Sequence, residues 1–156
     1  MRALQSPTAI ISSILGNIQV REEPPQTSPQ WSEVVLVAGF SPWQIRTIRR
    51  ICELLLLPQD WDSYGSPPPT KVAAHRAIQL VTGINPDSFL SPRVIPVPGG
   101  GVQLEWSLGE REVEIEIDDD GSVEYLKAER GRPITEGQIA LADLAGTHSL
   151  LSWLTA

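Results

Sequence analysis

The 156-residue chain has few of the side chains that form disulfides and metal centres. Its single cysteine, Cys52, excludes an internal disulfide and a cysteine-based metal cluster. Only two histidines are present, and no apolar run approaches the roughly 20 residues that a membrane-spanning helix needs. We therefore expect a protein without a membrane span, a bound metal or a cofactor.

The first 20 residues combine one early arginine with an apolar middle, as a secretory leader does. Ser12, Ser13, Gly16 and Asn17 interrupt that apolar stretch, and no clear small-residue cleavage site follows. These interruptions, together with the single cysteine, predict a cytoplasmic protein.

Negative charge is abundant and concentrated in one part of the chain. The net charge is −7, and residues 102–126 contain nine carboxylates and one arginine, so this segment alone carries −8. A phosphate backbone is repelled by such a surface, because affinity for nucleic acids comes mainly from cations. The charge distribution therefore argues against general nucleic-acid binding.

The N-terminal part of the chain differs in composition from the rest. Residues 1–31 are predicted to be an arm that ends in the proline-rich linker REEPPQTSPQW. Within the arm, Ile10, Ile14 and Ile18 recur at helical spacing. This apolar stripe either packs on the chain's own domain or docks on a partner. Residues 32–156 are predicted to form a single domain.

The clearest helix is predicted over residues 41–57. Ser41 and Gln44 form a capping box, and Pro42 occupies the first helical position. The outer side of this helix carries three arginines: Arg46, Arg49 and Arg50. They either contact nucleic acid or an acidic partner, or form a solvated face with ion pairs to Glu53.

Two more helices are predicted on either side of a series of strands. One spans residues 70–82. Thr135 and Gln138 form another capping box, which predicts a helix that begins there and continues over residues 139–145. Gly146 is predicted to end it, and Thr147 to cap a last helical turn.

From Arg93 onward, apolar and polar residues alternate as in antiparallel strands with one buried face. A two-residue turn at Gly109-Glu110 and a three-residue loop ending at Gly121 keep the apolar residues on one side. The residues predicted on that side include Val102, Leu104, Trp106, Val113, Ile115 and Ile117. We predict an α+β fold, an antiparallel meander of three to four strands with helices packed on one face.

The same register places carboxylates on the other face of the sheet, with Glu105 directly opposite Glu114. Opposed like charges destabilise a sheet. This face either keeps the sheet soluble, or docks a basic partner, or carries acid–base or metal chemistry. The residues concerned are Glu105, Glu112, Glu114, Glu116 and Glu124.

The sequence contains no arrangement typical of a catalytic site. His75 and His148 lie on separate predicted helices without a neighbouring nucleophile, and the glycines at 99–101 lead into a strand instead of the helix that phosphate binding uses. A small hydrolytic or metal-dependent enzyme would have to use the carboxylates Glu105, Glu114 and Glu116.

The loop DWDSYGSPPP at residues 60–69 joins the first two predicted helices and carries two aromatic residues. Gly65 permits a tight turn, and the prolines that follow cost little entropy to order. Trp61 and Tyr64 either fill the corner between the helix ends and the apolar face of the sheet, or form a rigid recognition loop that anchors a partner.

The segments WDSYGSPPP, GGVQLEW and DGSVEY together resemble a family of small bacterial proteins of uncharacterised activity. The shared pattern is a Trp-Asp-x-Tyr-Gly-Ala/Ser-x-Pro loop and a Gly-x-x-Leu-Glu-Trp strand. It covers residues 60–126, with Ser66 at the Ala/Ser position. The resemblance implies a prokaryotic origin and a shared α+β fold, and it implies no particular activity.

These observations predict a non-enzymatic protein-interaction module, an accessory subunit or antitoxin-like inhibitor that binds a basic partner. The predicted partner-binding residues are Trp61, Tyr64, Glu105, Glu112, Glu114, Glu116, Glu124, Ile10, Ile14 and Ile18. The alternatives are the small enzyme described above and nucleic-acid contact through the helix that carries Arg46, Arg49 and Arg50.

Overall fold

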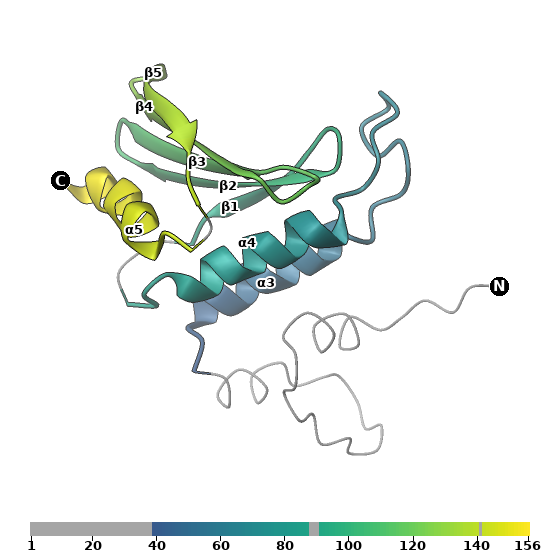
Figure 1. Ribbon diagram of the computed structural model, residues 1–156, viewed down its shortest axis with the longest axis horizontal. Helices are drawn as coiled ribbons and strands as arrows, with labels where there is room; N and C mark the ends of the chain where they lie inside the picture. Colours follow the sequence, from purple (N-terminus) through teal and green to yellow (C-terminus); the bar gives the residue numbers. More distant parts are fainter. Residues whose placement is uncertain (1–38, 88–90, 141) are drawn as a thin grey trace. The chain divides into compact units, whose positions relative to one another are not determined.

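The computed structural model describes residues 39–87, 91–140 and 142–156, and residues Phe40–Ala156 form one compact unit. The predicted arm, with Ile10, Ile14 and Ile18, lies outside the described residues. In the labels of Figure 1, the elements are α3 (Pro42–Leu54), α4 (Lys71–Gly83), β1 (Arg93–Val97), β2 (Gly101–Leu108), β3 (Arg111–Ile117), β4 (Val123–Glu129), β5 (Arg132–Gln138), α5 (Leu144–Ser152) and the 3₁₀ turn η1 (Trp153–Thr155).

The strands form one antiparallel meander in the order β1-β2-β3-β4-β5. The α+β class is therefore confirmed, and the sheet has five strands where three to four were expected. The predicted register is also confirmed, because Trp106 pairs with Val113 and Ile117 pairs with Val123. Gly109 and Gly121 take the positive φ angles of 62° and 89° that the two predicted turns require.

The fifth strand replaces part of an expected helix. Thr135 pairs with Lys127 in the β4–β5 ladder, so the predicted capping box at Thr135 and Gln138 is wrong. The helix begins later, after Asp143, whose side chain accepts a hydrogen bond from the Gly146 nitrogen. The local capping pattern gives way because residues 132–138 complete the backbone hydrogen bonding of β4.

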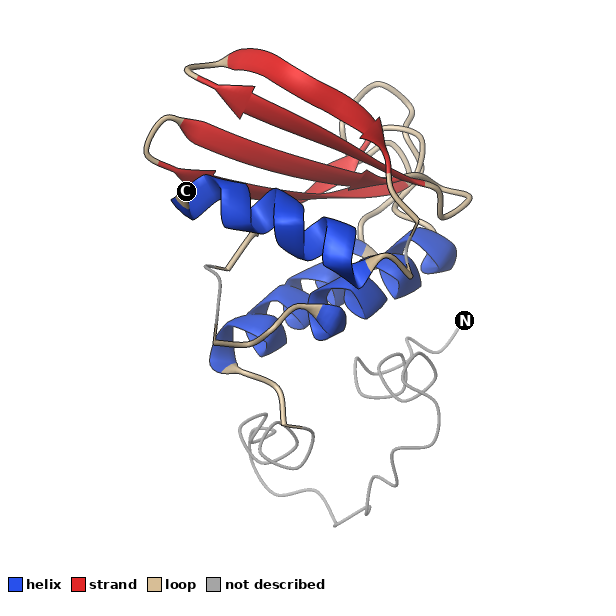
Figure 2. Ribbon diagram, turned by 60° about the vertical axis from the view of Figure 1, so that its left-hand side comes forward, coloured by secondary structure: helices blue, strands red, loops and turns tan. Residues whose placement is uncertain are grey.

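The buried core lies on one face of the sheet. Three apolar residues of β2 and three of β3 are at most 2% exposed: Val102, Leu104, Trp106, Val113, Ile115 and Ile117. Figures 1 and 2 show α3, α4 and α5 on this side of the sheet. Helix α4 turns Ala73, Ala74 and Ala77 inward, and all three are fully buried.

The two long helices are joined to each other through Gln44. Its side chain closes the capping box of α3 with Ser41, as predicted. Its Nε2 also donates to the carbonyl oxygens of Val81 and Ile84, at 3.0 and 3.1 Å. Because Gln44 is buried, these bonds satisfy an amide that would otherwise be costly, and they fix the start of α3 to the end of α4.

No helix in the described part of the chain has the length and apolar character needed to cross a membrane.

Candidate functional site

The face of the sheet opposite the core is lined by carboxylates and by few other charged groups; we call it the acidic face. No described helix lies over it in either view (Figures 1 and 2). Its carboxylates come from β2, β3, β4 and β5, and they are Glu105, Glu112, Glu114, Glu116, Glu124 and Glu136. The five glutamates predicted from the sequence therefore share one surface.

The register places like charges directly opposite each other on this face. Glu105 faces Glu114 across β2 and β3, and Glu116 faces Glu124 across β3 and β4. Gln103 Nε2 lies between the first pair and donates to Glu105 at 2.9 Å and to Glu114 at 3.2 Å. Beside the second pair, Gln138 Nε2 donates to Glu124 Oε1 at 3.4 Å.

One cation borders the acidic face at its β1 edge. Arg93 Nη2 lies 2.6 Å from Glu105 Oε2, and the Arg93 side chain is 73% exposed. The electrostatic balance is therefore uneven along the face. Glu105 has a cation and an amide donor, whereas the neighbours that act on Glu116 are Asp118, Glu124 and Glu114.

Crowding of this kind shifts the titration of two glutamates. Desolvation by partial burial, followed by repulsion from Glu105 and Glu112, raises the pKa of Glu114 above its ordinary value. Desolvation and then repulsion from Asp118 and Glu124 raise the pKa of Glu116. In both cases the ionised form is disfavoured, so an incoming cation would gain from restoring it.

The acidic face is hollowed between β4 and β5. The hollow measures about 370 Å³ and is lined by Glu114, Glu116, Glu124, Tyr125, Leu126, Glu136, Gly137 and Gln138. Gly137 pairs with Tyr125, and a Cβ at Gly137 would meet the Tyr125 ring at 3.2 Å, so the glycine leaves room for that ring across β5 on the other face of the sheet. Sequence reasoning missed Glu136, because the segment that carries it was expected to begin a helix.

The loop at residues 60–69 is held by a dense set of its own hydrogen bonds. Asp62 accepts from the Tyr64 and Ser66 nitrogens and from Ser66 Oγ, at 3.0, 3.2 and 2.5 Å. Asp60 Oδ1 accepts from the Gly65 nitrogen at 2.6 Å. The hydrogen bond from Ser66 is the main reason that the pKa of Asp62 is lowered. The bond from the Tyr64 nitrogen makes an Asx turn at Asp62.

The expectation that both aromatics of this loop fill a buried corner is wrong. Tyr64 is 92% exposed. Trp61 is only partly buried, and its indole nitrogen donates to the Pro67 carbonyl oxygen at 3.0 Å, within the loop itself. The buried members of the loop are Ser66 and Pro69. The hydrogen bonds that the Asp60 and Asp62 carboxylates accept explain the exposure of Tyr64, because they close the loop on itself and leave this side chain in solvent.

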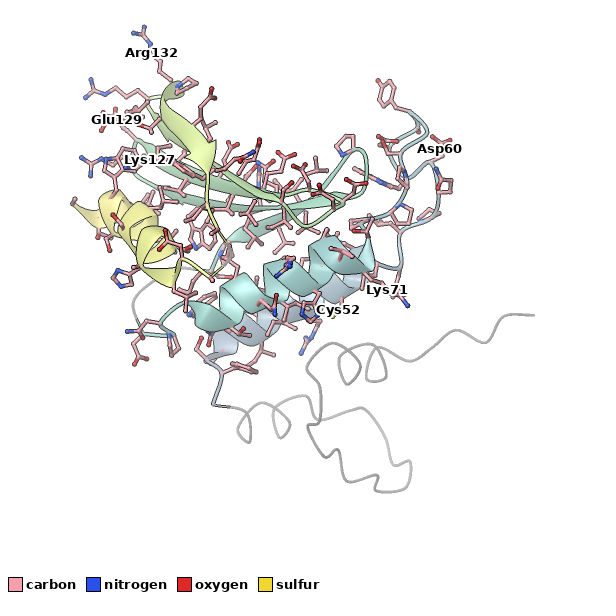
Figure 3. All side chains as sticks on the ribbon, viewed as in Figure 1. Cys52, Asp60, Lys71, Lys127, Glu129 and Arg132 are labelled. Carbon is pink, nitrogen blue, oxygen red and sulfur yellow. The ribbon has the colours of Figure 1, made fainter. Side chains whose placement is uncertain are left out.

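The base of the loop is attached to the turns at one end of the sheet. The Thr70 nitrogen donates to the Gly100 carbonyl, and Thr70 Oγ1 donates to the Asp119 carbonyl at 2.8 Å. Figure 3 shows Asp60 at this end and Lys127, Glu129 and Arg132 at the other. In Figure 1 the loop rises beyond the end of the sheet, away from α3 and α4.

Two other candidate groups of the sequence, the arginine cluster and the single cysteine, lie on α3 and not on the acidic face. The predicted Arg50–Glu53 pair is present at 3.2 Å and is exposed. Burial raises the pKa of Cys52 to about 11, so its thiol stays protonated and is a poor nucleophile. Among the residues that the structure describes, no group of three or more His, Cys, Asp or Glu side chains could hold a metal ion.

Comparison of the chain with protein-family models, with curated proteins and with solved structures gives no match. The function is therefore argued from the geometry of this chain alone.

Proposed function

We propose that the protein is a protein-interaction module, an accessory subunit or antitoxin-like inhibitor, that binds a basic partner through the acidic face. The observation that supports this most directly is the crowding of Glu114 and Glu116 on a face that no described helix covers. A sheet that held these residues only for solubility would gain by placing some cations among them. Lysine or arginine side chains of a partner would relieve the repulsion that the fold leaves in place.

The loop at residues 60–69 supplies an exposed aromatic side chain at one end of the sheet. Tyr64 is exposed, and the hydrogen bonds of Asp60 and Asp62 fix the backbone that carries it. A rigid exposed tyrosine loses little conformational entropy on binding, and tyrosine is enriched among residues that dominate interface energies. We assign charge steering to the acidic face and anchoring to Tyr64.

The experiment is affinity capture from a lysate of the protein's native host, with three baits compared by quantitative mass spectrometry. The first bait is the full chain, and the second carries Glu112→Gln, Glu114→Gln and Glu116→Gln. The third is a matched control that removes three carboxylates elsewhere: Glu53, Asp87 and Glu110. A basic protein should be retained by the first and third baits and lost from the second.

The outcome is decided by that contrast. Equal retention by all three baits, or equal loss from both variants, would show that the acidic face does not select the partner. Circular dichroism of each bait confirms that the sheet is folded before the comparison is made.

A small enzyme that uses Glu105, Glu114 and Glu116 is the second candidate, favoured by the raised pKa of Glu114. A glutamate that holds its proton more tightly than usual is suited to act as a general acid. Glu105, however, is already bonded to Arg93 and Gln103. A stoichiometric divalent ion in the purified protein would favour this candidate over the interaction module.

A further inference from the structure

A second surface, distinct from the acidic face, lies where α3 meets the edge strand β1. It is a shallow groove of about 700 Å³. Arg46, Thr47 and Arg50 of α3 form one wall, and residues 91–96 form the other. Among the described residues that line it, three are arginines and none is a carboxylate. Its charge is therefore opposite to that of the acidic face.

The strand at this groove has backbone groups available for pairing. β1 is an edge strand, bonded only to β2 within the sheet. Pro96 lacks an N–H and cannot exchange both hydrogen bonds with Val102, whereas Val97 accepts the turn bond from the Gly100 nitrogen. Because hydrogen-bonded and open pairs alternate along an antiparallel ladder, Val94 and Pro96 direct their backbone groups away from β2. Both residues line the groove.

The spacing of the arginines suits an extended chain. Arg46 and Arg50 are four residues apart on α3, which places them about 6 Å apart along the helix axis. Alternate side chains of a β-strand are about 6.6–6.8 Å apart. A strand that follows the groove can therefore bring two carboxylates, two residues apart in its sequence, to these two guanidinium groups.

These arginines can accept a new partner at small cost. Arg46 makes no ion pair with any residue in the described ranges. Arg50 is paired with Glu53, but both side chains are about half exposed, and such pairs are weak. Arg93 is 73% exposed although it contacts Glu105.

We propose that this groove binds an extended acidic segment of a partner protein, which pairs with β1 as an additional strand. Val94 supplies one N–H and one C=O to the new ladder, and Pro96 supplies a second C=O. Glutamate or aspartate at alternate positions of the segment meets Arg46 and Arg50. This mode of recognition takes its affinity from main-chain bonds and its specificity from side chains.

A single-stranded nucleic acid would meet the same arginines but fits the groove less well. Binding of single strands relies on aromatic side chains that stack on the bases, and no described lining residue is aromatic. A phosphate backbone also lacks the alternating N–H and C=O groups that would pair with the open edge of β1 at Val94.

The test uses the full chain and fluorescein-labelled nine-residue peptides, with binding measured by fluorescence anisotropy. One peptide alternates threonine and glutamate, a second has glutamine at each glutamate position, and a third has proline at its centre. We expect saturable binding of the first peptide. The glutamine peptide should bind less tightly, and proline should abolish binding because it removes a backbone donor and disfavours a continuous strand.

Variants of the chain locate the site. Arg46→Gln with Arg50→Gln should weaken binding of the acidic peptide about tenfold, as expected when two exposed ion pairs are lost. Arg130→Gln with Arg132→Gln removes the same charge at the turn between β4 and β5 and should leave binding unchanged. Amide exchange at Val94 should slow when the acidic peptide is bound.

Several results would overturn the proposal. These are no saturable peptide binding, equal weakening by both double variants, unchanged binding of the proline peptide, or tighter binding of an oligothymidine than of the acidic peptide. Thermal melting of each variant separates a lost site from a lost fold.

Discussion

At the scale of single residues, the same loop places one aromatic in contact with its own backbone and turns another to solvent. Trp61 is partly buried and bonded to Pro67, whereas Tyr64 is 92% exposed. The difference arises from Asp62, whose carboxylate accepts hydrogen bonds from the Tyr64 and Ser66 nitrogens. These bonds fix the backbone between the two residues. The first aromatic stabilises the loop, and the second is available to a partner.

Replacing Tyr64 by alanine should leave stability almost unchanged and reduce partner retention. The side chain loses almost no buried area, so we expect the unfolding free energy to change by less than about 0.5 kcal/mol, as for ordinary surface positions. Trp61→Phe is the matched variant, and loss of its hydrogen bond should cost about 0.5–1.5 kcal/mol without removing Tyr64. Urea unfolding measures the change in unfolding free energy of each variant, and affinity capture measures its retention of the partner. A large loss of stability in Tyr64→Ala would contradict the exposure described here.

Glu116→Gln should stabilise the protein by a few tenths of a kcal/mol at neutral pH, because it removes repulsion from Asp118, Glu124 and Glu114. The control is Glu53→Gln, which removes a weak favourable pair with Arg50 and should give no gain.

The stability of the chain should also depend on pH through Glu114 and Glu116. Their pKa values are raised on folding, so the folded state takes up protons more readily than the unfolded state. The unfolding free energy contributed by these groups therefore falls as pH rises from about 4.5 through the raised values, and recovers as pH is lowered. Urea titrations at several pH values should show a shallower dependence for Glu116→Gln. An equal dependence in the wild type and the variant would contradict the assignment.

At the scale of elements, turns and caps decide where each segment begins. Asp143 accepts from the Gly146 nitrogen and starts α5, while Thr135 lies in the middle of β5. Gly121 lies where the β3–β4 loop passes α4, and an added Cβ would come within 2.9 Å of Val72 Cγ1. Asp143 thus sets where α5 begins, and Gly121 allows the β3–β4 loop to lie close to α4.

Asp143→Ala should destabilise the protein by about 0.5–2 kcal/mol, the usual cost of removing an N-cap. Thr135→Ala should cost less, because Thr135 is an exposed strand residue. Thermal melts of the two variants compare them directly. A larger effect at Thr135 would indicate that the helix begins there after all.

Gly121→Ala should be more destabilising than Gly131→Ala. Both glycines have positive φ angles, of 89° and 69°, so both variants carry a backbone cost of about 1–2 kcal/mol. Only Gly121 also forces contact with Val72 and Arg76, whereas nothing lies within 4 Å of a Cβ at Gly131. If urea unfolding gave the same loss of unfolding free energy for both variants, α4 would have to move away from the added Cβ at Gly121 without an energetic cost.

At the scale of the whole domain, charge is separated in space. The acidic face lies on one side of the sheet, the arginine-lined groove lies between α3 and β1, and Arg130 and Arg132 lie at the turn before β5. Such separation orients an approaching charged partner, and its range is set by the Debye length. The acidic face should therefore act mainly on the rate of association.

Raising salt from 0.1 M to 1 M should slow association of a recovered basic partner much more than it speeds dissociation, because the Debye length falls from about 10 Å to about 3 Å. Deleting residues 1–20, which carry Ile10, Ile14 and Ile18, should instead speed dissociation and leave association nearly unchanged. Surface plasmon resonance measures both rates. Binding that is insensitive to salt would contradict the assigned role of the acidic face.

Periodicity and turn chemistry alone determined the sheet from β2 to β4. Alternation fixes which side chains share a face, and a shift of one residue would expose Ile115 and Ile117, so only one register was acceptable. The same alternation along the strands predicts that Glu105, Glu114 and Glu116 lie on one surface. The capping box at Ser41 likewise needs only contacts within one helical turn.

Only the tertiary structure decided β5, the loop at residues 60–69 and the groove beside β1. Residues 132–138 contain a sound capping pattern, and they become a strand because β4 has backbone groups to satisfy. The turn before them uses Arg130 at a φ angle of 54°, a residue type that gives no turn indication in sequence. The base of the loop is bonded to Gly100 and Asp119, and Arg46 and Arg93 line one groove, because segments that are distant in the chain meet at these places. Local patterns report neighbours along the sequence, and these features depend on neighbours in space.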